Sequence, residues 1–138
     1  MIKGKDASAY TVSLWEDDTE IAYSKRGDAT DYLKEKLHNR LQVYQNTTFY
    51  NVASLEIDST YGTKQDDGSY KLNYISTTTT IDDDAKPTFK YTINENYVDV
   101  WVSADTIYGD LRIPITVTIN VDGTLVSLDK VWNINLGD

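Results

Sequence analysis

The 138-residue sequence contains no cysteine, two prolines, one histidine and no long hydrophobic run. Without cysteine the chain has no disulfide, no thiolate nucleophile and no cysteine-ligated zinc. No run approaches the ~18 apolar residues that a membrane-spanning helix needs, so we expect no membrane insertion. Residues 1–6 carry two lysines without a following apolar segment, so we expect no secretion signal there. The sequence is compatible with a location in the cytoplasm or in a virion.

Positive charge is also scarce, because 13 basic residues face 22 acidic residues and give a formal net charge of −9. A chain with this balance repels phosphate backbones and anionic lipid. We therefore expect no direct binding to nucleic acid.

Patterns that indicate catalysis or a cofactor are missing as well. His38 is the single histidine, and the sequence offers no neighbouring nucleophile or carboxylate that would orient it as a base. Glycines are scattered singly, so no phosphate-binding loop precedes a helix. Acidic clusters such as residues 82–84 lack the alternating spacing of a calcium loop, and turn formation explains them. We expect no enzyme, no cofactor and no metal.

The clearest positive pattern is a β-hairpin in the last quarter of the chain. Every odd position from Leu111 to Val121 is apolar, while the even positions are polar or proline, a period that only a half-buried strand uses. Asp122-Gly123 follows and favours a type I′ turn. This turn predicts that Val117 pairs with Leu128, and Ile113 with Trp132.

An amphipathic helix is predicted over residues 28–45. Asp28 is a good N-cap, and Leu33, Leu37, Leu41 and Tyr44 form one apolar stripe. The predicted fold is therefore α+β, with about 7–8 mostly antiparallel strands in hairpins and this helix packed on the sheet. One domain spans 1–138. A single wrapped sheet and a two-sheet sandwich fit the pattern equally well.

Aromatic residues on the polar side of a predicted strand mark a candidate interaction surface. Tyr97 and Trp101 flank Asp99, out of phase with the neighbouring valines. Aromatic residues of this kind are enriched at protein interfaces. Arg112 and Pro114, on the polar face of the C-terminal hairpin, complete the candidate surface, since proline marks a sheet edge or break.

Three functions from different classes follow from these observations. The first is a non-enzymatic structural or interaction protein that binds a protein partner or itself. The abundance of Tyr, Thr, Asn and Asp in short strands resembles the composition of phage virion parts and bacterial surface domains. The second is an acidic inhibitor, of the anti-defence type, of a nucleic-acid-binding enzyme.

The third function is a small-ligand binding module. The order of elements from residue 28 onward resembles that of cystatin-like and NTF2-like domains, although no residue motif supports the resemblance. It implies a pocket between helix and sheet, for which the candidate lining residues are Leu37, Leu41, Phe49 and Tyr74. We take the first function as the leading hypothesis.

Overall fold

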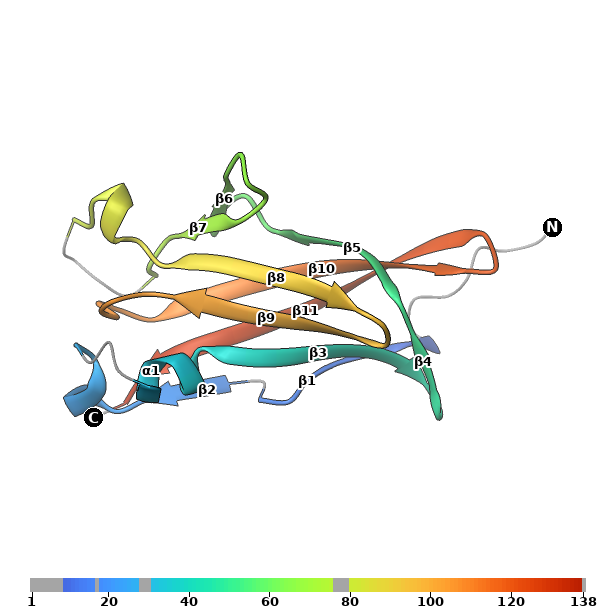
Figure 1. The fold of residues 1–138 in the computed structure, drawn as a ribbon, viewed down its shortest axis with the longest axis horizontal. Helices are drawn as coiled ribbons and strands as arrows, with labels where there is room; N and C mark the ends of the chain where they lie inside the picture. Colours follow the sequence, from blue (N-terminus) through green and yellow to red (C-terminus); the bar gives the residue numbers. More distant parts are fainter. Residues whose placement is uncertain (1–8, 17, 28–30, 76–79, 138) are drawn as a thin grey trace.

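A computed structural model describes residues 9–16, 18–27, 31–75 and 80–137 and shows two β-sheets stacked face to face (Figure 1). Sheet A has seven strands: β1 (Thr11–Leu14), β3 (His38–Gln45), β4 (Thr48–Tyr50), β6 (Gly62–Lys64), β7 (Tyr70–Leu72), β8 (Thr88–Asn94) and β9 (Tyr97–Ser103). Sheet B has four strands: β2 (Asp18–Ile21), β5 (Val52–Ile57), β10 (Leu111–Val121) and β11 (Thr124–Leu136). Of the two arrangements compatible with the sequence, the chain adopts the one with two sheets.

The strand order is β1-β3-β9-β8-β7-β6 in sheet A, where β4 also pairs with β3, and β2-β11-β10-β5 in sheet B. Pairing is antiparallel except between β2 and β11, which run parallel. The described helical segments are short: α1 (Asp31–Lys36) and the 3₁₀ turns η2 (Tyr23–Lys25) and η3 (Asp83–Ala85). No helix in the described part of the chain is long and apolar enough to cross a membrane.

The inner faces of the two sheets form one hydrophobic cluster. Sheet A contributes residues such as Leu41 and Val100, and sheet B contributes Ile113, Val117 and Trp132; all of them are fully buried. Burying one such aliphatic side chain stabilises a fold by about 1.5–3 kcal/mol. The core therefore lies between the sheets, and the outer faces are left for other roles.

The C-terminal hairpin has the predicted register. Val117 pairs with Leu128, and Ile113 pairs with Trp132. Asp122 and Gly123 both have positive φ, 53° and 89°, as a type I′ turn requires. Alternation and turn chemistry agree here, so the prediction is confirmed.

The amphipathic helix predicted over residues 28–45 is wrong for most of its length. Residues 31–36 form the short α1, and residues 38–45 form strand β3 in the middle of sheet A. Leu37 and Leu41 are four residues apart, a spacing that places both on one face of a helix and also on one face of a strand. Val43, two residues beyond Leu41 and equally buried, fits only the strand. The expected N-cap, Asp28, lies outside the described residues.

The chain changes sheets four times before its midpoint. β1 pairs with β3 in sheet A, whereas β2 pairs with β11 in sheet B, so these two consecutive strands form no hairpin with each other. The buried Trp132 Nε1–H donates a 2.8 Å hydrogen bond to the buried Thr19 Oγ1 and ties β2 to β11. At Asn51 the chain passes from β4 in sheet A to β5 in sheet B.

Candidate functional site

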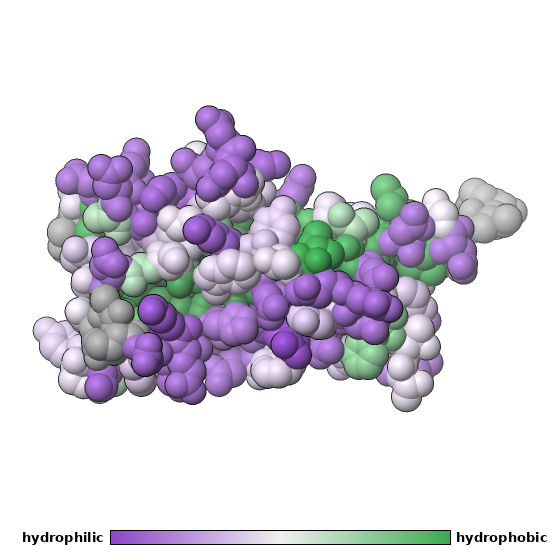
Figure 2. All heavy atoms as spheres, in the orientation of Figure 1, coloured by the Kyte–Doolittle hydropathy of each residue, from purple (hydrophilic) through white to green (hydrophobic). Residues whose placement is uncertain are grey.

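The outer face of β3, β9 and β8 carries a grid of polar and aromatic side chains. Along β9 the even positions are buried against sheet B, so Tyr97, Asp99 and Trp101 point outward. Cross-strand pairing places His38 beside Trp101 and Arg40 beside Asp99. Figure 2 views the molecule from the side of sheet A, and hydrophilic residues cover most of this face. We call the set Trp15, His38, Arg40, Tyr97, Asp99 and Trp101 the aromatic face.

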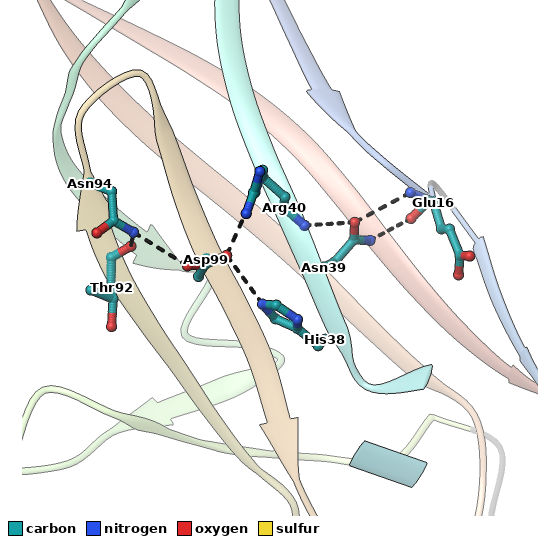
Figure 3. A network of polar contacts seen from close by, with 7 residues as sticks. All are labelled: Glu16, His38, Asn39, Arg40, Thr92, Asn94 and Asp99. Carbon is teal, nitrogen blue, oxygen red and sulfur yellow. Dashed lines mark hydrogen bonds and ion pairs between the residues drawn. The ribbon is translucent and has the colours of Figure 1, made fainter. Parts of the chain in front are cut away.

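Asp99 is the hub of a hydrogen-bond network that spans three strands (Figure 3). Its Oδ1 lies 3.1 Å from His38 Nε2 on β3, and its Oδ2 accepts a 3.3 Å hydrogen bond from Asn94 Nδ2 on β8. Arg40 Nε lies 3.7 Å from the same Oδ1, an ion pair too long for a hydrogen bond. These partners hold the Asp99 carboxylate in one orientation on the sheet surface.

Arg40 is held by two aromatic rings as well as by its ion pair. Its guanidinium carbon lies 4.1 Å from the centre of the Tyr97 ring and 4.5 Å from that of Trp15. Each cation–π contact at a partly exposed site contributes about 0.5–1 kcal/mol. Trp15 is otherwise 67% exposed. The stacked arrangement therefore fixes a cation and two rings on the surface before any partner arrives.

His38 has a carboxylate neighbour that the sequence did not reveal. Asp99 is 61 positions away in the chain, and only the pairing of β3 with β9 brings the two side chains together. Trp101 packs edge-on against the His38 ring, with centroids 6.5 Å apart. The pair provides an oriented imidazole, which is one part of a general-base site. Among the described residues, no nucleophilic side chain is recorded in contact with the His38 ring.

A groove with a volume of about 920 Å³ crosses this face. Outward residues of β8 and β9 form its floor, and its sides come from α1, from the segment around η3 and from the residues that follow β9. The polar and aromatic lining residues are Lys34, His38, Lys71, Asp82, Asp84, Lys86, Thr88, Thr92, Asn94, Asp99, Trp101, Ser103, Asp105, Thr106 and Tyr108. Donors and acceptors are thus both plentiful in one open depression.

A second, smaller hollow of about 430 Å³ shares Trp101 and Thr92 with the groove. The turn between β6 and β7 forms its far side through Asp67, Gly68 and Ser69. Hydrogen bonds from the Ser69 hydroxyl and from its backbone N–H hold the pKa of Asp67 below its usual range. The two hollows therefore meet at the Trp101 ring.

The structure distributes the predicted surface residues over both sheets. Tyr97, Asp99 and Trp101 are neighbours on the outer face of sheet A, whereas Arg112 and Pro114 lie on β10 in sheet B. Pro114 lies where the pairing of β10 with β5 stops, since that ladder begins at Ile115. The first three residues thus belong to one site and the last two do not.

The four predicted pocket residues do not surround one cavity. Leu37 lines the groove, while Leu41 is buried between the sheets and Phe49 lies on β4 against Tyr44. Tyr74 packs edge-on against Tyr108, a groove residue, with centroids 6.0 Å apart. Burial raises the pKa of Tyr74 to about 12.

Most groove residues could not be recognised from the sequence. Thr92, Lys71 and Asp82 come from separate segments and have no pattern in common. Arg40 was assigned to a helix, so its place between Trp15 and Tyr97 had no basis in the sequence. The one usable signal was the out-of-phase Trp101.

Known proteins add no information on the site. The chain matches no protein-family model, and comparison with curated proteins and with solved structures gave no significant match. Among the described residues no group of three or more His, Asp or Glu side chains is placed to hold a metal ion.

Proposed function

We propose that this protein is a non-enzymatic interaction protein, a β-rich subunit or binding module that contacts its partner through the aromatic face of sheet A. The observation that carries the proposal is the position of Trp101, an aromatic ring on an outer sheet face between two hollows. A ring placed there makes no contribution to the core between the sheets. It gives a partner an apolar surface to cover.

The neighbours of Trp101 have the composition of a contact surface. Trp, Tyr and Arg are the residues most enriched among those that dominate binding energy. Here Trp15, Arg40 and Tyr97 are already stacked, so little side-chain entropy is lost when a partner binds. The preorganised network around Asp99 supports the same reading.

The groove also favours the third hypothesis, a module that binds a small or elongated ligand. Its volume lies within the range of ligand sites, roughly 300–1,000 Å³. The acidic-inhibitor hypothesis finds less support, because four aspartates of the groove stand beside three lysines and give no uniform negative field. The volume and the mixed lining of the groove support an interaction on this face.

A photo-crosslinking amino acid tests the location of the interaction. It is introduced at Trp101 and, as a matched control, at Leu125, an apolar residue of β11 that is 66% exposed on sheet B. Irradiation in lysate of the source organism is followed by mass spectrometry of the adducts and by binding of the purified partner to Trp101→Ala. We expect adducts from position 101 alone, and at least about tenfold weaker binding by the variant.

The same experiment detects self-association, because the adduct then joins two copies of the chain. Sedimentation should in that case give a mass that rises with protein concentration. Equal adducts from positions 101 and 125, or unchanged partner binding by Trp101→Ala, would contradict the proposed face.

A further inference from the structure

The lining of the groove is balanced in charge, which decides the class of ligand. Four aspartates and three lysines line it, together with threonine, serine and asparagine side chains. A site for a phosphate or sulfate ligand concentrates positive charge, and a site for a cation concentrates carboxylates. Neither holds here, and the chain as a whole carries −9. A neutral ligand with many hydroxyl groups matches this mixture, since hydroxyls both donate and accept.

Trp101 adds a requirement on the shape of the ligand. Its ring belongs to the lining of both hollows, so a ligand that fills them must pass over it. Such a ligand is elongated and has an apolar patch in its middle. A pyranose ring has this character, because its C–H bonds face an aromatic ring while its hydroxyls point sideways. Asp99 and Thr92, next to Trp101 on the sheet, are placed to meet those hydroxyls.

The backbone beneath the groove argues against a peptide. An extended peptide binds a sheet by pairing with the backbone of an edge strand. β9 is paired on both sides, with β8 and with β3, so its backbone groups are already used. β8 is paired with β9 along its whole length but with β7 only at Thr88 and Phe89, so the backbone free for a peptide is limited to one short side of β8. The outer face of the two strands offers mainly side chains, which is how a saccharide is recognised.

We propose that the groove and the adjoining hollow bind a neutral oligosaccharide that crosses the Trp101 ring. The sugar ring stacks on Trp101, and Asp99, Asn94 and Thr92 hydrogen-bond its hydroxyls. The Asp99 carboxylate keeps its orientation through His38 and Arg40. This inference rests on the proposed function, since it names the ligand of the same face.

Nuclear magnetic resonance of the ¹⁵N-labelled full chain tests the proposal with defined sugars. The probes are cellotetraose, chitotetraose, maltotetraose and mannotetraose at millimolar concentration. A heparin tetrasaccharide and a pool of uncharged peptides serve as comparison ligands. We expect at least one neutral sugar to shift the Trp101 indole signal and the amides of β8 and β9. The buried Trp132 indole and the amides of β10 should stay in place.

Variants separate binding from folding. Trp101→Ala should weaken sugar binding at least about tenfold, and Trp101→Phe, which keeps an aromatic ring, should weaken it less. Asp99→Asn, which keeps the shape of the side chain, should also weaken binding, while Leu125→Ala on sheet B should leave it unchanged. If Trp101→Ala does not fold, the sugar affinities of Trp101→Phe and Asp99→Asn relative to the native chain test the proposal.

Three results would overturn the assignment: no shift with any neutral sugar, shifts as large in Trp101→Phe and Asp99→Asn as in the native chain, or shifts caused only by heparin or by peptides. The proposed function would survive the last result and fail if crosslinking at position 101 found no partner at all.

Discussion

Replacing Thr19 with valine should destabilise the protein, because the buried indole N–H of Trp132 then has no hydrogen-bond acceptor. Thr19 Oγ1 accepts the indole N–H of Trp132 at 2.8 Å, and both residues are almost completely buried. Valine has nearly the same shape but no oxygen, so the indole N–H loses its partner without a change in volume. A buried donor left unsatisfied costs about 1–3 kcal/mol. The free energy of unfolding of Thr19→Val should fall by that amount.

Urea denaturation followed by the fluorescence of the tryptophans measures the effect. The midpoint should decrease with an unchanged slope, because the native surface stays the same. For a chain of this length each kcal/mol lowers Tm by about 3–5 °C, between the values for smaller and larger domains. Thr19→Ser is the matched control, since it keeps the oxygen and loses only a methyl group, about 1 kcal/mol.

A double-mutant cycle isolates the hydrogen bond from the packing. Trp132→Phe removes the donor, and Thr19→Val in that background no longer strands a polar group. The second substitution should then cost about 1 kcal/mol less than it does alone. Additive effects of the two substitutions, or a Thr19→Val protein within 0.5 kcal/mol of the native chain, would refute the reasoning.

Two further predictions concern a turn and a half-buried tyrosine. Gly123→Ala should destabilise the protein by about 1 kcal/mol or more, because Gly123 has a φ of 89° that a Cβ disfavours; thermal unfolding measures this, and an unchanged Tm would contradict the turn. The raised pKa of Tyr74 favours the neutral phenol in the folded state. Its contribution to stability is therefore complete below pH 10 and is lost as the pH rises toward about 12. After allowance for the partial exposure of Tyr74, this contribution to stability amounts to about 1 kcal/mol. Tyr74→Phe should therefore lose less stability across that pH interval than the native chain. Urea denaturation at each pH measures the difference. Equal losses in the two proteins would contradict it.

The sequence was most informative where two independent patterns agreed. In the C-terminal hairpin the alternation of apolar residues and the Asp122-Gly123 turn specify the same register, and the structure has it. The hairpin of β8 and β9 combines the same two features, since Ile93 pairs with Val98 around a tight turn in which Asn96 has a positive φ of 69°. Local patterns suffice for hairpins because both strands lie close together in the chain.

Residues 38–45 show where one pattern is not enough. The spacing of Leu37 and Leu41 fits a helix and a strand alike, and the long-range pairing of β3 with β1 and β9 favoured the strand. Asn46 has a positive φ, 55°, but it lies in the turn between β3 and β4 and ends no helix. The pairing with neighbouring strands, and not the local helix propensity, decides the structure of this segment, as in most β-rich folds.

The aromatic face was predictable only in part, for the same reason. Tyr97, Asp99 and Trp101 share one strand, so their common direction follows from alternation alone. Their partners His38 and Arg40 belong to a strand about 60 positions earlier, and nothing in the sequence specifies which strands become neighbours. A surface assembled across strands has to be read from the structure.

The place of β11 has a consequence for how the chain is made. This last strand lies inside sheet B, between β2 from the beginning of the chain and β10. During synthesis the ribosome must deliver residue 136 before β2 has the neighbour on which it docks. Until then the apolar inner side of sheet A has no complete counterpart, and the nascent chain exposes apolar surface that favours aggregation.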